Sequence, residues 1–234
     1  MLTVKGLKLV QEDFSLQADM VLKPGGITAV IGPSGGGKST FLSAIAGFLA
    51  PDHGGILWDG RDLTGLAPGD RPVSILFQDN NLFPHLSVAQ NVGLALRPSL
   101  RLSTSDRARV AEVLASVGLA GLEDRKPGRL SGGQQSRAAL ARVLLADRPV
   151  VLLDEPFAAL GPGLKQEMLA LVRDRLAGPD RVVLMVTHDP RDAQLVADDV
   201  VLVADGRAAP PMATQALFGN PPPALADYLG RGVG

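Results

Sequence analysis

A glycine-rich stretch decides the fold of this chain: Gly32-Pro33-Ser34-Gly35-Gly36-Gly37-Lys38-Ser39-Thr40. It matches the phosphate-loop pattern G-x-x-x-x-G-K-[ST], in which glycines let the backbone curl so that successive N–H groups converge on phosphate oxygens. A helix that begins at the end of the loop adds its positive dipole end. Lys38 supplies a cation to the outer phosphates, and the Ser39 hydroxyl is placed to ligate Mg²⁺. We therefore expect this loop to bind the phosphates of a nucleotide.

The residues around the loop predict a strand before it and a helix after it. The turn Pro24-Gly25-Gly26 leads into the apolar run Ile27–Ile31, which is typical of a buried strand. After the loop, a helix is expected from Lys38 to about Leu49, where Pro51 prevents its continuation. Upstream, the broken alternation of apolar residues as far as Leu22 indicates antiparallel strands.

Later apolar runs predict the rest of a sheet. Those with the length and composition of buried strands are Val73–Phe77, Val150–Leu153, Val182–Val186 and Val200–Val203. Those in the C-terminal half alternate with helix-compatible stretches, which is typical of a parallel sheet covered by helices on both faces. The sequence therefore predicts an α/β fold, in which Pro221–Pro223 lead into a short tail.

The region from about Ser87 to Gly128 loses the strand pattern and is expected to form a helical side lobe. Ser103 and Thr104 are capping candidates, and Gly118 is placed to end the helix. The apolar residues that repeat at helical spacing between them are Val110, Val113, Leu114 and Val117.

The bulk composition limits the possible functions. A chain of 234 residues is long enough to bury a core as one domain without disulfides, and it contains no cysteine. Its net charge of −1 provides no long-range attraction to nucleic acid or to an anionic bilayer, so phosphate binding must be local. The N-terminus lacks the pattern of a signal peptide, and no apolar run approaches the ~20 residues needed to span a bilayer. We expect the protein to stay in the cytoplasm.

A second motif is Val150-Val151-Leu152-Leu153-Asp154-Glu155, an apolar strand that ends in two carboxylates. α/β sheets bind ligands at the carboxyl ends of their strands. Asp154 is placed there to hold Mg²⁺ through water, and Glu155 can accept a proton from an attacking water molecule. Taken alone, the pattern also fits a strand followed by an acidic helix cap. Together with the phosphate loop it indicates a nucleotide site.

A third motif, Leu130-Ser131-Gly132-Gly133-Gln134, precedes the helix-compatible run Ala138–Leu145. A serine hydroxyl and glycine N–H groups at a helix start form a second surface suited to phosphate. A turn with a serine cap is the alternative interpretation. One ATP molecule cannot easily use both phosphate-binding surfaces of one subunit.

These three motifs occur in the order found in ATP-binding-cassette (ABC) ATPases, and the chain resembles that family over nearly its whole length. The resemblance implies a P-loop NTPase ABC ATPase fold with a RecA-like core, an N-terminal antiparallel β subdomain and a helical subdomain. It implies a single ABC ATP-binding domain over residues 1–234, with the helical subdomain at about residues 87–135, and it implies ATP and Mg²⁺ as cofactors. Family members work as head-to-tail homodimers that sandwich two ATP molecules, so the signature motif Ser131–Gln134 would bind the partner's ATP.

The resemblance also assigns roles to single residues. Gln78, after the strand Val73–Phe77, would contact Mg²⁺ and the membrane partner, and His188, after the strand Val182–Val186, would hold the γ-phosphate. The implied catalytic residues are Lys38, Glu155 and His188, and the implied metal ligands are Ser39, Gln78 and Asp154. The implied nucleotide-binding residues are Gly32, Pro33, Ser34, Gly35, Gly36, Gly37, Lys38, Ser39, Thr40, Gln78, Ser131, Gly132, Gly133 and Gln134.

A finer resemblance lies in the segment Arg71–Val92, which contains the pair Asn80-Asn81. This segment is similar to that of the ATPase subunits of bacterial thiamine importers. It implies an ATP-hydrolysing subunit bound peripherally at the cytoplasmic face of the inner membrane, where it energises a permease supplied by a periplasmic substrate-binding protein. An iron or polyamine importer would share every motif above and stays an alternative.

Two functions outside transport are also compatible with the cassette. A DNA-maintenance ATPase usually carries a long coiled coil or a DNA-binding domain between the phosphate loop and the signature motif. Here fewer than about a hundred residues separate them and no basic surplus exists, so we expect no nucleic-acid partner. An ATP-binding switch that does not hydrolyse is the other alternative.

The chain departs from the family pattern at two places. Where the family has Ser-Ala-Leu-Asp after the catalytic glutamate, this chain has Ala158-Ala159-Leu160-Gly161. We expect a missing contact between subunits. Because glycine permits backbone angles that aspartate tolerates poorly, we also expect a looser turn, with extended backbone before Pro162. The second departure is at the place of the aromatic residue that stacks on adenine in the family, where Gln11 stands in this chain and Phe14 is the nearest aromatic candidate.

Overall fold

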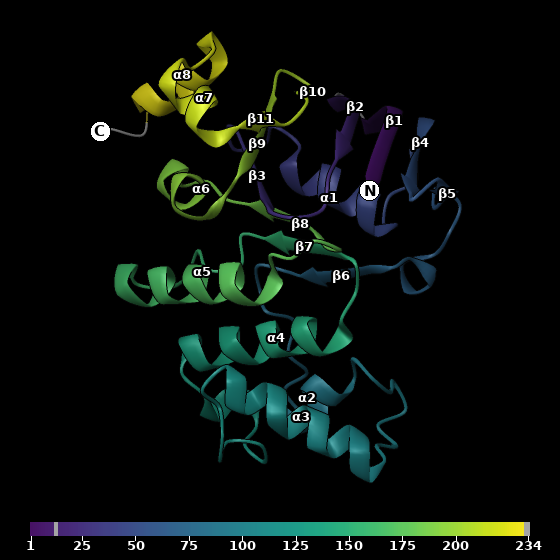
Figure 1. Cartoon of the computed structure of the whole chain (residues 1–234), viewed down its shortest axis with the longest axis vertical. Helices are drawn as coiled ribbons and strands as arrows, with labels where there is room; N and C mark the ends of the chain where they lie inside the picture. The colour runs from purple at the N-terminus through teal and green to yellow at the C-terminus, as the bar shows by residue number, and fades with distance from the viewer. Residues whose placement is uncertain (12–13, 232–234) are drawn as a thin grey trace.

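The computed structural model describes residues 1–11 and 14–231 and contains a mixed sheet with helices on both faces (Figure 1). The strand order is β5-β4-β1-β2-β10-β9-β3-β8-β7-β6, and β11 pairs with β9. The strands are β1 (Leu2–Gln11), β2 (Phe14–Leu22), β3 (Ile27–Ile31), β4 (His53–Trp58), β5 (Arg61–Asp62), β6 (Val73–Leu76), β7 (Val150–Asp154), β8 (Val182–Val186), β9 (Asp199–Ala204), β10 (Arg207–Ala208) and β11 (Met212–Ala213). The α-helices are α1 (Lys38–Ala46), α2 (Val88–Gly93), α3 (Thr104–Ser116), α4 (Gly132–Ala146), α5 (Pro162–Leu176), α6 (Pro190–Val196), α7 (Thr214–Gly219) and α8 (Pro223–Arg231).

The central strands are parallel and buried on both faces. β3 pairs with β8 and β9, β8 with β7, and β7 with β6. Because successive side chains of a strand point to opposite faces, Val30 joins the cluster that contains Phe41 of α1, whereas Ile31 joins the cluster covered by α4, α5 and α6. Figure 1 shows α1 and α4 on opposite sides of β6 and β7. The predicted strands are confirmed, and the parallel pairing brings the carboxyl ends of β3 and β7 to one edge.

β1 and β2 extend the sheet as antiparallel strands, as the alternation before Leu22 predicts. β4, which the sequence pattern did not predict, pairs antiparallel with β1. In β2, buried and exposed residues alternate from Leu16 to Leu22, because one face packs into the cluster that contains α1. β10 connects the two parts of the sheet, since it runs parallel to β2 and antiparallel to β9. This extension carries Phe14, the first residue of β2, to the phosphate loop.

The segment between β6 and β7 forms the helical lobe. α2, α3 and α4 share a hydrophobic cluster of their own, which includes Leu114 and Ala141. The Ser103 hydroxyl accepts a hydrogen bond from the Asp106 N–H at 3.1 Å, and the Asp106 carboxylate accepts one from the Ser103 N–H at 3.0 Å. This capping box starts α3, which ends before Gly118, so the predicted helix and its serine cap are confirmed.

α1 ends at Ala46, earlier than the predicted Leu49. Gly47 adopts φ 91° and ψ 12°, a left-handed conformation that closes the helix. The buried Arg71 guanidinium donates hydrogen bonds of 2.8 and 2.9 Å to two carbonyl oxygens in the last turn of α1. A Cβ at Gly47 would lie 2.5 Å from Arg71 Nε, so only glycine fits. Gly47, rather than Pro51, therefore ends α1, and Arg71 packs against that end.

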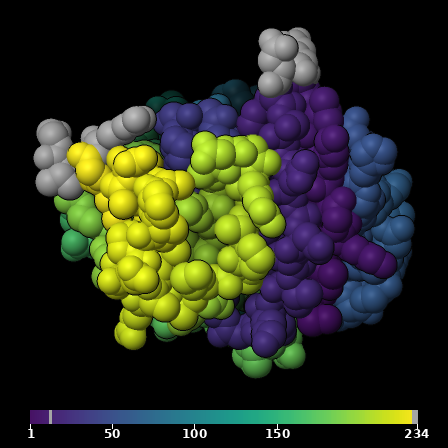
Figure 2. All heavy atoms as spheres, turned by 90° about the horizontal axis from the view of Figure 1, so that it is seen from above, coloured from purple at the N-terminus to yellow at the C-terminus, as the bar shows by residue number. Residues whose placement is uncertain are grey.

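The predicted short tail after Pro221 is instead the helix α8, in which Leu225 is fully buried in the core. Figure 2 shows the C-terminal helices in yellow beside the yellow-green segment of β9 to β11.

β6 also differs from the prediction and ends at Leu76 rather than Phe77. None of the helices within residues 1–11 and 14–231 has the length and apolar character that a membrane crossing needs.

Candidate functional site

The phosphate loop connects β3 to α1, and Lys38 lies at its end. The Lys38 ammonium donates hydrogen bonds to the Gly32 and Pro33 carbonyl oxygens, each at 2.9 Å. Burial lowers the pKa of Lys38, and the carboxylates of Glu155 and Asp154 oppose that effect. The ammonium is therefore held over the loop and close to two carboxylates.

A pocket of about 410 Å³ opens above the phosphate loop. It is lined by Gln11, Phe14, Ser34, Gly35, Gly37, Lys38, Ser39, Thr40 and Glu155. The Phe14 ring packs directly on the loop, since a Cβ at Gly37 would lie 2.4 Å from Phe14 Cζ, and Gly37 has φ 98°. Both residues considered for adenine, Phe14 and Gln11, thus line the same pocket as the phosphate loop.

Asp154, the last residue of β7, lies next to the start of α1. Ser39 Oγ donates a hydrogen bond to Asp154 Oδ1 at 3.1 Å, so the hydroxyl and the carboxylate expected to hold Mg²⁺ are adjacent. Burial raises the pKa of Asp154, while the Ser39 hydrogen bond and the charge of Lys38 oppose the increase. A bound cation would favour the ionised form of this carboxylate.

Glu155 is held in an unusual conformation next to His188. Its φ is 45°, in the left-handed region that few residues other than glycine adopt. Its N–H donates a hydrogen bond to the Val186 carbonyl oxygen at 3.2 Å, and its Oε2 lies 2.9 Å from His188 Nδ1. The main chain therefore turns at Glu155 so that its carboxylate meets the His188 imidazole.

Side chains from α5 and α6 hold the segment around His188. Thr187 Oγ1 donates a hydrogen bond to Asp192 Oδ2 at 2.7 Å. Lys165 Nζ lies 3.2 Å from Asp189 Oδ2 and 2.8 Å from Asp192 Oδ1. Nothing in the sequence motifs points to Lys165, because its partners are brought to it only by the packing of α5 against α6.

Asp189→Asn should lower the free energy of unfolding at pH 7 by about 1 kcal/mol, once the shift of the Asp189 pKa is discounted for screening by solvent. Partial burial raises the pKa of Asp189, but hydrogen bonds from Arg191 and Lys165 outweigh it and lower the pKa from 3.8 to about 2. The ionised carboxylate therefore stabilises the fold fully above about pH 4, and this stabilisation is lost as the pH falls through about 2. Urea unfolding over this pH range should show the wild type and the variant converging in acid.

A difference in unfolding free energy that stays constant down to pH 2 would contradict this ion-pair assignment. Asp19→Asn is the matched control, because Asp19 is an exposed carboxylate on β2. Its unfolding free energy should change by less than about 0.5 kcal/mol.

The signature motif forms the start of α4. Ser131 Oγ accepts a hydrogen bond from the Gln134 N–H at 3.3 Å, and Gln134 Oε1 accepts one from the Ser131 N–H at 3.0 Å. Ser131 and Gly132 are exposed, whereas Gly133 is buried, and Gln78 is exposed in the loop after β6. The phosphate loop and the carboxylates are thus brought together, while Gln78 and the signature motif are not among the described residues that line that pocket.

Arg142 of α4 holds the loop that follows Gln78. Its guanidinium donates hydrogen bonds to the Asn81 carbonyl oxygen at 2.8 Å and to the Asn80 carbonyl oxygen at 3.0 Å. Both asparagines have positive φ, 58° for Asn80 and 48° for Asn81. The motifs give Arg142 no role, although an arginine within the apolar run Ala138–Leu145 is a signal that could have found it.

The turn at Gly161 has ordinary backbone geometry. Gly161 is the N-cap residue of α5, with φ −64° and ψ 157°. The predicted extended backbone before Pro162 is confirmed. Any residue adopts this conformation, so the turn does not use the backbone angles that glycine alone permits. A Cβ at Gly161 would meet nothing within 4 Å.

Comparison with known proteins identifies the family of this chain. A family model described as ABC transporter matches residues 16–158. The thiamine import ATP-binding protein ThiQ of Cereibacter sphaeroides is 64% identical over 230 residues, which cover 98% of this chain and 100% of that protein. The ThiQ protein of Brucella suis is 50% identical over 218 residues, which cover 93% of this chain and 90% of that protein.

Solved structures share the fold. The dimeric post-hydrolysis state of the ATP-binding cassette MJ0796, bound to ADP and Pi, is 28% identical with a TM-score of 0.78, and the match covers 92% of this chain and 99% of that one. CbiO1 from Clostridium perfringens, part of the ABC transporter complex cbiONQ, is 31% identical with a TM-score of 0.82. The match covers 94% of this chain and 90% of the CbiO1 chain. The predicted ABC ATPase fold is confirmed. The chain belongs to the ABC transporter family, as an ATP-binding protein that resembles ThiQ.

Proposed function

We propose that this protein binds and hydrolyses Mg-ATP as the ATPase subunit of a bacterial ABC importer for thiamine. The observation that carries the proposal is the contact between Glu155 and His188 beside a preformed phosphate loop. Relatives that are 64% and 50% identical over nearly the whole chain are named thiamine import ATP-binding proteins, which supports thiamine as the transported compound.

The phosphate loop and its neighbours would hold the nucleotide and the metal. The main-chain N–H groups within residues 34–40 and the Lys38 ammonium bind the phosphates, with Ser34 and Thr40 in the pocket lining. Ser39 and Asp154 provide the hydroxyl and carboxylate oxygens that Mg²⁺ prefers, and Gln78 adds an amide oxygen. Mg²⁺, when bound, neutralises charge on the phosphates.

Glu155 and His188 would carry the hydrolytic step. The Glu155 carboxylate accepts a proton from the water molecule that attacks the γ-phosphate. His188 contacts the γ-phosphate and, through Nδ1, keeps the Glu155 carboxylate in place. Both act beside Lys38, which balances the charge of the outer phosphates.

A head-to-tail homodimer would complete the site. The exposed Ser131 and Gly132 at the start of α4 bring N–H groups and the positive end of a helix to the ATP bound by the other copy. The Ser131 hydroxyl accepts a hydrogen bond inside its capping box, so its proton is free for a phosphate oxygen. MJ0796 is dimeric with ADP and Pi bound, which supports this arrangement.

The dimer would bind a permease at the cytoplasmic face of the inner membrane, and a periplasmic substrate-binding protein would deliver thiamine to that permease. CbiO1 is part of an ABC transporter complex, which supports such a partner. Residues 1–234 would form one ABC domain, in which the helical subdomain at about 87–135 moves with the exposed Gln78 when ATP binds and is hydrolysed.

Reconstitution in lipid vesicles with the permease and the binding protein tests this function. Phosphate release should require Mg²⁺ and should rise when the binding protein carries thiamine. Stimulation by an iron- or polyamine-loaded binding protein instead would assign a different importer. Stimulation by duplex DNA would indicate a DNA-maintenance ATPase, and ATP binding without phosphate release would indicate a non-hydrolysing switch.

Gly161→Asp, combined with Ala158→Ser, should raise the Hill coefficient of ATP hydrolysis in the assembled transporter. A carboxylate at Gly161 can contact the second subunit, and it can cap α5, which now begins without a side-chain cap. ATP titrations of both proteins measure the change. Superimposable curves with equal maximal rates would show that the missing carboxylate has no consequence. Gly163→Asp is the control, because it adds the same charge two residues further into the helix.

A further inference from the structure

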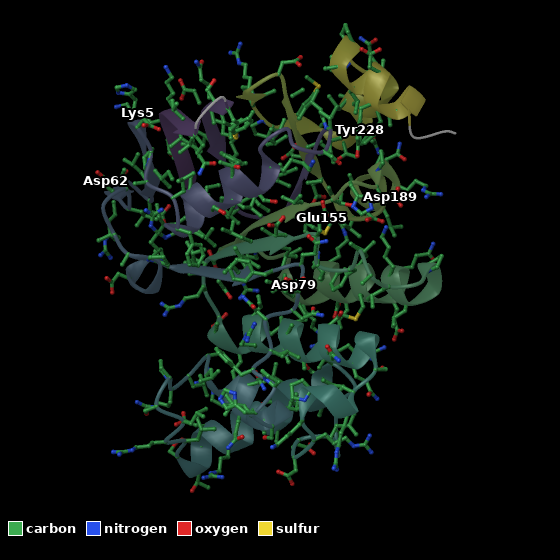
Figure 3. The ribbon with its side chains drawn as sticks, turned by 180° about the vertical axis from the view of Figure 1, so that it is seen from behind. Lys5, Asp62, Asp79, Glu155, Asp189 and Tyr228 are labelled. Atoms are coloured by element: carbon green, nitrogen blue, oxygen red, sulfur yellow. The ribbon has the colours of Figure 1, made fainter. Side chains whose placement is uncertain are left out.

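The C-terminal helix α8 reaches the segment that carries His188. Leu225 of α8 is fully buried in the core cluster shared with α5 and α6, and Tyr228 is partly buried against the same cluster. The Tyr228 hydroxyl donates a hydrogen bond to the His188 carbonyl oxygen, across 40 positions of sequence. Figure 3 shows Tyr228 on the same side of the molecule as Asp189 and Glu155. A residue of the predicted tail therefore contacts the main chain of a catalytic segment.

The main chain around His188 controls where the imidazole points. The His188 side chain is 54% exposed, so packing alone does not fix its direction. The residues on either side are anchored, since Thr187 donates a hydrogen bond to α6 and Asp189 pairs with α5. At His188 itself, the main-chain carbonyl oxygen accepts a hydrogen bond from the Tyr228 hydroxyl. Rotation of that peptide group would turn the His188 Cα–Cβ bond and change the distance from Nδ1 to Glu155.

We propose that Tyr228 is a positioning residue for ATP hydrolysis: its hydroxyl orients the main chain of His188 and thereby keeps the imidazole at the Glu155 carboxylate. This inference rests on the proposed function, because it needs His188 to act in hydrolysis. Burial raises the pKa of Tyr228, and the charges of Asp189 and Glu155 raise it further. The hydroxyl therefore keeps its proton at neutral pH and remains a hydrogen-bond donor.

Tyr228→Phe removes the hydroxyl and keeps the ring. In the full-length protein assembled with its permease, kcat for ATP hydrolysis should fall about fivefold, the effect of one lost hydrogen bond, while KM for ATP stays unchanged. KM should not move because the Lys38 and loop contacts to the phosphates are intact. The melting temperature should stay within about 2 °C of the wild type, since the packing of α8 is preserved.

The double variant Tyr228→Phe/His188→Ala separates positioning from a structural effect. If Tyr228 acts through His188, adding Tyr228→Phe to the His188→Ala variant should cause no further loss of kcat, because the imidazole that the hydroxyl positions is already gone. The same fivefold loss in the His188→Ala background would overturn the proposal, because the hydroxyl would then act independently of His188. Unchanged kcat in Tyr228→Phe alone would overturn it as well.

Thr214→Val is the matched control. Thr214 Oγ1 also donates to a main-chain carbonyl oxygen near the C-terminus, that of Ala197 at 2.8 Å, and the bond is buried. This variant should lower the melting temperature without lowering kcat, whereas an equal fall of kcat in both variants would assign the Tyr228 effect to general loosening. Failure of the function itself is distinguishable, because a wild-type protein without phosphate release would overturn the proposed function before any variant is compared.

Discussion

Lys38→Ala should lower the ATPase rate of the assembled transporter by at least about 10²-fold. The Lys38 ammonium is the cation held over the phosphate loop by the Gly32 and Pro33 carbonyl oxygens, and it lies close to both carboxylates of the site. Without it, the outer phosphates lose their cationic side-chain partner, and the repulsion between the phosphates and the two carboxylates increases. Phosphate release and binding of a fluorescent ATP analogue measure the loss.

Lys5→Ala is the control for the charge change. Lys5 is an exposed lysine on β1, and it lies outside the pocket above the loop. The Lys5 variant should retain the wild-type rate and the wild-type affinity for the analogue. Near-wild-type ATPase in the Lys38 variant would rule out the assignment of residues 32–40 as the nucleotide site.

Glu155→Gln should slow hydrolysis by ~10²-fold or more while ATP binding is retained. The amide has the shape of the carboxylate and keeps a contact with His188 Nδ1, which now lies 2.9 Å from Oε2, but it does not accept the proton of the attacking water. ATP should therefore stay trapped, and the ATP-bound dimer should accumulate. Single-turnover phosphate release and gel filtration with Mg-ATP measure these two effects.

Glu112→Gln is the matched control for Glu155→Gln, because Glu112 is an exposed glutamate on α3 in the helical lobe. It should hydrolyse at the wild-type rate and elute as the wild type does. Unchanged turnover of Glu155→Gln, together with only monomer under Mg-ATP, would count against both the base role of Glu155 and the proposed dimer.

Much of the fold could be predicted because its signals are local. The strands β3, β7, β8 and β9 are buried on both faces, so their sequences are continuous apolar runs. In β2, apolar and polar residues alternate because one of its faces is exposed. The serine caps of α3 and α4 were also predictable from local sequence. Ser103 and Ser131 each form a capping box with the residue three positions later, Asp106 and Gln134.

The motifs that form the candidate site could be predicted, but the positions and conformations of their residues in space could not. The phosphate loop and the pair Asp154-Glu155 each carry a spacing that is specific to nucleotide chemistry. Parallel pairing of β3, β8 and β7 then places them at one edge. No pattern in the sequence indicates the left-handed conformation of Glu155, because it results from the main-chain hydrogen bond to Val186 on the neighbouring strand.

The sequence by itself determined the fold class and the nucleotide motifs, because each strand, helix and motif is encoded by residues within about ten positions of one another. Only the tertiary structure decided that Arg71 contacts the end of α1, which side chains hold His188, and that α8 packs on the core. Arg71 reaches α1, and Tyr228 reaches His188, across long stretches of chain. Such contacts have no local periodicity, since they exist only after the whole chain has packed and each donor meets its acceptor.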